Sequence, residues 1–144
     1  MQDFKDLHVW RKAHALALHV YRVTDSDPGR KHVALVGQSR RAAISIGANI
    51  AEGCARVTPR DFAKFLNISY ASASELENHM ILARDIRVIG PREFRAVSQQ
   101  IDEVRRMLTG LIRRVRERER SGTSGGLRDQ GSTPGPPASS SPDD

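Results

Sequence analysis

The chain has 144 residues and a formal net charge of +6, a length typical of one domain whose core suffices for a small helical bundle. Its single cysteine, Cys54, excludes a disulfide within the chain and a zinc site of the usual cysteine and histidine spacing. Charged residues near the start argue against a signal peptide, and no apolar run approaches the roughly 18 residues of a membrane helix, so we expect a soluble, cytoplasmic protein.

Four long helices are predicted, and turn signals separate them. Asp25–Gly29 is a cluster of turn residues, Thr58 and Pro59 are typical of the start of a helix, and Gly90 with Pro91 ends one helix and begins the next. The expected helices are about Asp6–Thr24, Lys31–Arg56, Pro59–Val88 and Pro91–Arg118, with Asp6 as the N-cap of the first. No segment alternates like a strand, so the pattern predicts an all-α, antiparallel up-down four-helix bundle.

The composition changes at Ser121, after which glycine, serine, proline and aspartate dominate. Such a segment cannot offset the entropy of ordering. We therefore predict a bundle over residues 1–120 and a disordered tail over residues 121–144. Residues 1–120 contain 22 lysines and arginines against 14 aspartates and glutamates, a net charge of +8, so the basic character belongs to the bundle.

Apolar stripes with steps of three and four residues define the expected core. The clearest, in the fourth helix, contains Phe94, Val97, Ile101, Val104, Leu108, Leu111 and Val115. The first helix has two stripes, one with Val9, Ala13, Leu16, Val20 and Val23, the other with Leu7, Trp10, His14, Ala17 and Tyr21. The second stripe either widens a single core face or packs against a neighbouring copy of the chain.

Residues 38–53, QSRRAAISIGANIAEG, place a small polar stripe beside the apolar stripe of the second helix. Serine and asparagine compete with the backbone for hydrogen bonds, and Gly47 costs about 1 kcal/mol relative to alanine, so the segment needs a compensating role. We interpret it as a structural hydrogen-bond network between the second and third helices. Its predicted members are Gln38, Ser45, Asn49, Glu52, Ser72 and Glu75, with Ser69 as a further candidate. A binding pocket between helices is the alternative.

The positive charge around the second and third helices is the candidate for function. The predicted nucleic-acid contacts are Arg40, Arg41, Arg56, Arg60 and Lys64. Arginine and lysine contacts to phosphates supply most non-specific affinity, and the helix that starts near Thr58 adds backbone donors. The alternative is a solvated face with local ion pairs. Because no set of interleaved aromatic residues is present, we expect little base specificity and place Trp10, Tyr21 and Tyr70 in the core or an interface.

Ser45-Ile46 followed by Asn49–Gly53, with Arg40-Arg41-Ala42 before them, resembles the four-helix-bundle proteins encoded in 23S rRNA intervening sequences. Leu7–Ala13, Phe62–Glu77 and Met107–Ile112 are similar to the first, third and fourth helices of that family. The resemblance covers roughly residues 4 to 117, and Gly47 stands where many members have proline. The family includes accessory proteins of diversity-generating retroelements. The resemblance implies a ring-shaped homopentamer that binds nucleic acid and a reverse transcriptase.

No catalytic site is predicted, and no metal or cofactor is expected. The sequence has no His-Glu-x-x-His metalloprotease motif and no glycine-rich phosphate loop ahead of a helix. We therefore predict a non-catalytic basic scaffold that binds structured RNA or DNA, with a reverse transcriptase as a candidate partner. The alternative is an oligomeric structural or protein-interaction adaptor whose charge only keeps it in solution.

Overall fold

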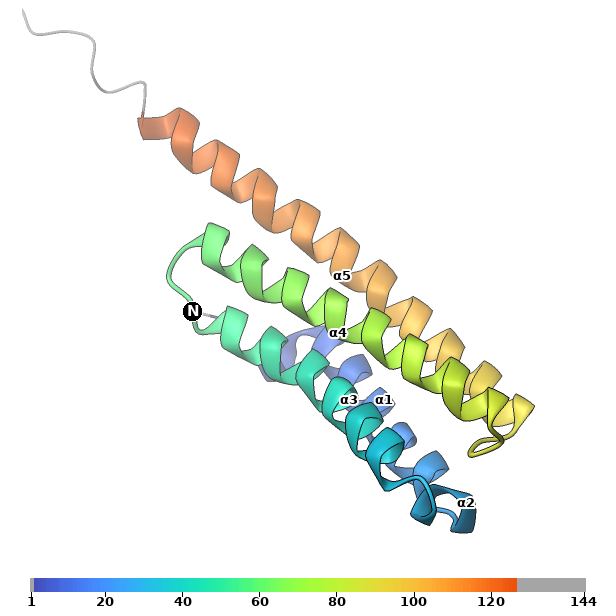
Figure 1. Cartoon of the computed structure of the whole chain (residues 1–144). Coiled ribbons are helices and arrows are strands. Elements are labelled where there is room, and N and C mark those ends of the chain that lie inside the picture. Colours follow the sequence, from blue (N-terminus) through green and yellow to red (C-terminus); the bar gives the residue numbers. More distant parts are fainter. Residues whose placement is uncertain (1, 127–144) are drawn as a thin grey trace, which may run out of the picture.

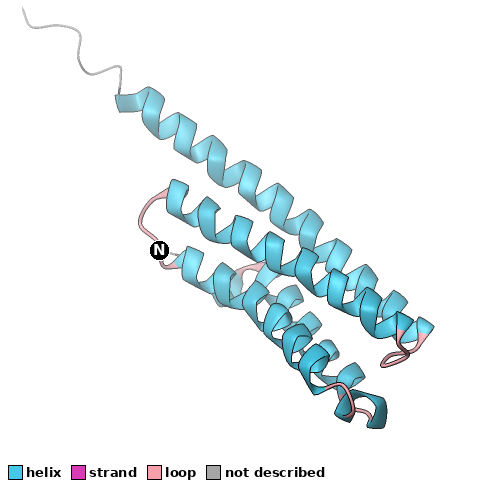
Figure 2. Ribbon diagram, viewed as in Figure 1, coloured by secondary structure: helices cyan, strands magenta, loops and turns pink. Residues whose placement is uncertain are grey.

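The computed structural model describes residues 2–126, and these residues form a bundle of four long helices. Successive long helices run in opposite directions, and the described residues contain helices and loops only (Figures 1 and 2). The long helices are α1 (His8–Thr24), α3 (Val33–Cys54), α4 (Pro59–Asp85) and α5 (Pro91–Gly126), with a 3-10 turn η1 (Phe4–Asp6) and a short helix α2 (Asp27–Arg30). The predicted all-α fold with four packed helices is confirmed.

The core lies between the apolar stripes of the four long helices. α1 and α4 each pack against both α3 and α5. Leu16 of α1, Ile46 of α3, Leu66 of α4 and Leu108 of α5 are completely buried. Burial of such a side chain stabilises the folded state by about 1.5–3 kcal/mol, so these stripes supply the main driving force for folding. The predicted stripe of α5 is confirmed, because every member after Phe94 is buried.

The start of α4 follows its predicted signal. The side-chain oxygen of Thr58 accepts a hydrogen bond of 3.2 Å from the backbone N–H of Asp61, and Pro59 holds the first helical position. The start of α1 differs from the prediction, because Asp6 lies in the preceding 3-10 turn and Leu7 holds the N-cap position without a side-chain hydrogen bond. Helix α3 continues through Gly47 without a break.

The connection between α1 and α3 contains helix α2 where a turn was predicted. The hydroxyl oxygen of Ser26 caps this helix by accepting a hydrogen bond of 3.1 Å from the backbone N–H of Gly29. A Cβ atom on Gly29 would lie 2.1 Å from the carbonyl oxygen of Thr24, which explains why glycine is required there. Ser26 and Gly29 therefore shape a tight return between the two long helices.

Helix α4 ends three residues earlier than predicted because Arg87 adopts a left-handed conformation with a φ of 63°. The N–H of Arg87 donates to the carbonyl of Arg84 at 3.0 Å, and the N–H of Val88 donates to the carbonyl of Ala83 at 2.8 Å. These two bonds satisfy the last carbonyls of α4 in a Schellman motif. Glycine usually holds this left-handed position, and an arginine there is strained.

Helix α5 is longer than predicted and extends past the start of α4 (Figure 1). Ser121–Gly126, the first residues of the predicted tail, continue the helix, because each residue added to an existing helix gains a backbone hydrogen bond without a new nucleation step. The rest of the predicted tail, residues 127–144, lies outside the described residues. Within the described residues, no helix combines the length and the apolar character needed to cross a membrane.

Candidate nucleic-acid interface

Three members of the predicted polar network join α3 to α4 by hydrogen bonds. The hydroxyl oxygens of Ser45 and Ser72 lie 2.8 Å apart, and the side-chain amide of Asn49 donates to the Ser45 hydroxyl at 2.9 Å. Beside them, the buried Ser69 hydroxyl donates to the carbonyl of Ile46 at 2.7 Å. Small side chains let the two backbones approach here, and their hydroxyl groups satisfy one another inside the contact.

The other three predicted members lie outside this group. Gln38 is exposed and has no side-chain hydrogen bond within the described part of the chain. A carboxylate oxygen of Glu52 lies 3.6 Å from the guanidinium of Arg56, which follows the end of α3. A carboxylate oxygen of Glu75 lies 3.2 Å from Nε2 of His79, on the same helix α4. These longer side chains reach solvent, because a carboxylate between the helices without a cationic partner would lose its hydration.

The five predicted nucleic-acid contacts do not form one cluster. Arg40 is half-buried and joins α3 to the end of α1: its Nε donates to the Thr24 hydroxyl at 3.1 Å, and its guanidinium lies 4.4 Å from the centre of the Tyr21 ring. Arg56 lies past the other end of α3, where its guanidinium covers the Phe65 ring at 4.5 Å. Arg40 and Arg56 thus both have partners within the chain, and their role in nucleic-acid binding stays a prediction.

The remaining three predicted contacts, Arg41, Arg60 and Lys64, are exposed. None of them has an ion pair or side-chain hydrogen bond to another described residue. Arg41 lies on α3, whereas Arg60 and Lys64 are one helical turn apart on the first two turns of α4. The structure therefore divides the predicted set between two places and leaves Arg60 and Lys64 together on α4.

A basic groove runs between α4 and α5 and has a volume of about 370 Å³. We call it the α4/α5 groove; its lining residues are Asn67, Tyr70, Thr109, Ile112, Arg113, Arg116 and Arg120. The three arginines are exposed and have no ion pair or hydrogen bond to any other described residue. These arginines were not among the residues predicted from the sequence to contact nucleic acid. Their spacing of three and four residues, which places them on one face, was the available signal.

Arg105, two turns earlier on α5, differs from these arginines because it forms ion pairs within the bundle. Its guanidinium bonds to the carboxylates of Glu77 on α4, at 2.5 Å, and Asp102, at 2.8 Å. The hydrogen bonds that the guanidinium donates to Asp102 and to Glu77 raise the pKa of Arg105 above its ordinary value. Arg105 thus ties α4 to α5, whereas the arginines of the α4/α5 groove retain their hydrogen-bonding capacity for a ligand.

Comparison with known proteins places the chain in a family. The model of the 23S rRNA-intervening sequence protein family matches residues 5–110. The chain belongs to this family. A crystal structure from Bacteroides thetaiotaomicron VPI-5482, described as a protein of unknown function from the S23 ribosomal protein family, is similar at 25% identity with a TM-score of 0.68. The similarity covers 72% of this chain and 97% of that one. No match is found among curated proteins.

The family match includes the α3–α4 polar network but ends before the basic part of α5. Ser45, Asn49 and Ser72 lie inside the matched residues 5–110, whereas Arg113, Arg116 and Arg120 follow them. The part of the chain that matches the 23S rRNA-intervening sequence protein family therefore includes the residues that join α3 to α4. The three arginines of the α4/α5 groove lie beyond the residues that the family model matches.

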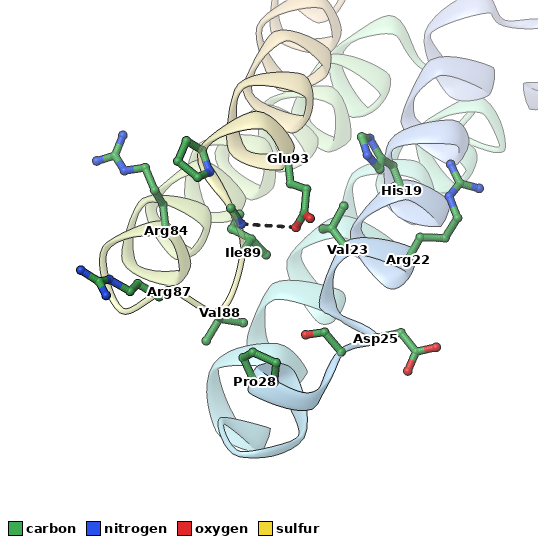
Figure 3. Close-up of a pocket in the computed structure, with 13 residues that line it drawn as sticks. His19, Arg22, Val23, Asp25, Pro28, Arg84, Arg87, Val88, Ile89 and Glu93 are labelled. Carbon is green, nitrogen blue, oxygen red and sulfur yellow. Dashed lines mark hydrogen bonds between the residues drawn. The ribbon is translucent and has the colours of Figure 1, made fainter.

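A cavity of about 770 Å³ lies at the opposite end of the bundle. Figure 3 shows Arg22 at one side of the cavity and Arg84 and Arg87 at the other, with their side chains extending outward. Glu93 lies near its centre and accepts a hydrogen bond of 3.4 Å from the backbone N–H of Gly90, which caps the start of α5 (Figure 3). The cations do not converge on one point, and a carboxylate occupies the centre, so this cavity is a poor site for an anion.

An apolar groove of about 450 Å³ lies on α1 and α3. Trp10 and His14 stack there with ring centres 5.0 Å apart, and Leu18 and Ile44 are 48% and 50% exposed. The second apolar stripe of α1 contributes to both places: Trp10, His14, Ala17 and Tyr21 line this groove, and Leu7, Trp10 and Ala17 also pack against the core. An exposed apolar surface of this kind is typical of a protein contact.

No group of three or more metal-ligating side chains occurs within residues 2–126. Cys54, at the end of α3, is buried, and burial raises the pKa of its thiol above the ordinary value. The thiol therefore stays protonated at neutral pH and is a weak nucleophile.

Proposed function

We propose that the chain is a non-catalytic scaffold that binds nucleic acid, chiefly through phosphate contacts at the α4/α5 groove. The observation that carries this proposal is the row of Arg113, Arg116 and Arg120 along one groove, each free of carboxylate partners within the described residues. Guanidinium groups bind phosphate oxygens in a bidentate fashion and stay charged at every physiological pH. A polyanion is the ligand that complements such a row.

The charge around the groove supports the proposal. Residues 113–120 carry five arginines and two glutamates, and residues 1–120 together carry a net charge of +8. Because α4 and α5 are antiparallel, Arg60 and Lys64 at the start of α4 lie toward the basic end of α5 (Figure 1). Lys64 is also one turn from Asn67 of the groove, so the basic surface continues from α5 onto α4. Such a surface concentrates a polyanion near the groove.

The resemblance to retroelement accessory proteins supports two extensions of the proposal. We propose that copies of the chain assemble into a ring-shaped homopentamer and that a reverse transcriptase is a partner. The apolar groove of α1 and α3, with Leu18 and Ile44 at its surface, is a suitable contact between copies. A ring would place several basic grooves on one particle and strengthen its attraction for a long nucleic acid.

Fluorescence anisotropy of the full chain with a labelled RNA hairpin and a DNA duplex, over a series of salt concentrations, tests the proposal. We expect affinity to fall steeply with salt. Replacing Arg113, Arg116 and Arg120 by glutamine is expected to reduce the slope of log affinity against log salt by about 2 to 3, since each lost phosphate contact removes roughly 0.7–0.9. Sedimentation of each variant, run in parallel, tests whether assembly is unchanged.

A matched control removes the same charge elsewhere. Arg22, Arg92 and Arg95 are exposed, lie toward the other end of the bundle, and have no ion pair or hydrogen bond within residues 2–126. Their replacement by glutamine is expected to have a much smaller effect. Equal losses in the two triple variants would show that only net charge matters and would reject the groove. If the native chain bound neither nucleic acid at low salt, the adaptor function, based on the apolar groove of α1 and α3, would replace the proposal.

A further inference from the structure

The aromatic residue in the α4/α5 groove sets this surface apart from a simple charged face. Tyr70 was expected in the core or an interface, but it is 37% exposed and lines the groove with the three arginines. Its side chain has no hydrogen bond or ring contact with another described residue. The nearly buried side chain of Ile112 forms an apolar part of the same lining. The groove therefore combines a partly exposed aromatic ring and an apolar side chain with cations that have no partner among the described residues.

The polar side chains of the groove leave acceptors unoccupied. The amide N–H of Asn67 donates to the carbonyl of Ala63 at 2.9 Å, and the hydroxyl of Thr109 donates to the carbonyl of Arg105 at 2.9 Å. The hydroxyl proton of Thr109 and one of the two amide N–H groups of Asn67 are thus used within their own helices, and an oxygen of each side chain stays available. Such oxygens can accept hydrogen bonds from the N–H groups on the edge of a nucleobase.

We infer that the α4/α5 groove holds an unpaired nucleotide, with its base against Tyr70 and its flanking phosphates on Arg113, Arg116 and Arg120. This inference rests on the proposed function and specifies its ligand as single-stranded nucleic acid. The combination of an aromatic ring, acceptors and a basic rim matches the three parts of a nucleotide strand. The volume of about 370 Å³ lies within the range of small-molecule sites, so a base and part of its sugar fit.

A duplex can make only some of the contacts that the groove offers. Its phosphates can reach the arginines, but its bases are paired and stacked, and withdrawing one from the stack costs a few kcal/mol. An unpaired loop, bulge or single strand presents its bases without that cost. We therefore expect the chain to prefer unpaired segments, with the preference due to Tyr70 and most of the salt dependence due to the arginines.

A pair of strands that differ only in their bases tests the inference. The probes are a labelled oligothymidylate and a strand of the same length and charge in which every nucleotide is an abasic tetrahydrofuran analogue. Anisotropy with the full chain is expected to give roughly 5- to 150-fold tighter binding to the oligothymidylate, the range that corresponds to stacking of one base on an aromatic side chain. Both strands carry the same phosphates, so the ratio reports on the base alone.

Two variants of Tyr70 separate stacking from packing. Tyr70→Phe keeps the ring and is expected to retain the preference for the strand with bases. Tyr70→Leu keeps an apolar side chain against Ile112 and is expected to bind both strands equally, with its salt slope unchanged. Because Tyr70 is partly exposed, both variants are expected to fold, and circular dichroism during thermal unfolding checks this.

The outcomes distinguish the inference from the proposed function. If the native chain binds both strands with the same affinity and the same dependence on Arg113, Arg116 and Arg120, phosphate binding stands and the nucleotide site is rejected. If the preference for bases persists in Tyr70→Leu, the base lies elsewhere and the site is also rejected. Failure to bind either strand or the RNA hairpin at low salt would overturn the proposed function as well.

Discussion

The hydroxyl groups of Ser45 and Ser72 form a bond of 2.8 Å whose direction follows from their neighbours. The Ser72 hydroxyl has one proton and lies 3.1 Å from the carbonyl of Ile68, so all of these bonds form together only when Ser72 donates to that carbonyl and Ser45 donates to Ser72. Ser45 in turn accepts from the amide of Asn49. The chain of bonds therefore runs one way, from Asn49 through Ser45 and Ser72 to the backbone of α4.

A double-mutant cycle on this pair measures what the bond contributes. Ser45→Ala and Ser72→Ala are each expected to lower the free energy of unfolding by about 1 kcal/mol, with a coupling energy of about 0.5–1.5 kcal/mol between them. Urea unfolding followed by circular dichroism gives all four values. Asn49→Leu is expected to cost more, because a larger apolar group replaces the amide at the helix contact. Strict additivity of the two alanine variants would contradict a direct bond.

Replacement by alanine is expected to have opposite effects on stability at two glycines of α3, Gly53 and Gly37. A Cβ atom on Gly53 would lie 2.8 Å from Cδ2 of Phe62, so Gly53→Ala is expected to destabilise the bundle by about 1–3 kcal/mol. A Cβ atom on Gly37 would meet no atom within 4 Å, and Gly37→Ala is expected to stabilise α3 by about 0.5–1 kcal/mol. Thermal unfolding of the two variants is the measurement. A gain in stability for both would mean that α4 shifts freely to accommodate the methyl group.

Arg40 contacts α1, whereas its neighbour Arg41 is exposed, so we expect their replacement by glutamine to change stability by different amounts. Arg40→Gln removes the hydrogen bond to Thr24 and the cation–π contact with Tyr21, with an expected loss of about 1–2 kcal/mol. Arg41→Gln is expected to change stability by less than about 0.5 kcal/mol, as exposed substitutions usually do. Chemical denaturation compares them. Neither variant is expected to reduce nucleic-acid affinity as far as the groove triple variant does.

Arg87 has a left-handed backbone conformation, so we expect its replacement by glycine to stabilise the fold. Arg87→Gly removes the side chain that makes a φ of 63° unfavourable, and we expect a gain of about 0.5–1 kcal/mol in the free energy of unfolding. Arg87→Ala serves as the control, because it removes the charge but keeps the Cβ atom, and its stability is expected to stay near that of the native chain. A glycine variant no more stable than the alanine variant would show that the position is unstrained.

Local signals were sufficient for most of the fold. The steps of three and four in α5 and the pair Thr58 and Pro59 report on a single helix, and the structure confirms both. The end of α4 was missed because the left-handed position is held by Arg87 instead of glycine, so the usual signal is absent. The start of α1 was missed because Asp6 is the kind of residue that caps a helix, yet it lies in a preceding 3-10 turn.

The candidate site was harder to predict because it depends on contacts between helices. Arg40 has the charge of a phosphate ligand, but its partners Thr24 and Tyr21 come from α1, and no spacing within α3 indicates them. The α4/α5 groove needs Tyr70 of α4 beside Arg113 of α5, an arrangement that only the packing of the two helices reveals. Composition located the positive charge in the bundle but could not say which cations were free.

The one-way chain of hydroxyl bonds between α3 and α4 also fixes the register of the two helices. If α4 slipped by four residues in either direction, the apolar Ile68 or Leu76 would take the place of Ser72 opposite Ser45. The Ser45 hydroxyl would then lose its acceptor in a partly buried contact, at a cost of about 1–3 kcal/mol. Apolar stripes alone tolerate such a slip, since they repeat every turn. Two small hydroxyl groups thus distinguish one alignment of the bundle from its near neighbours.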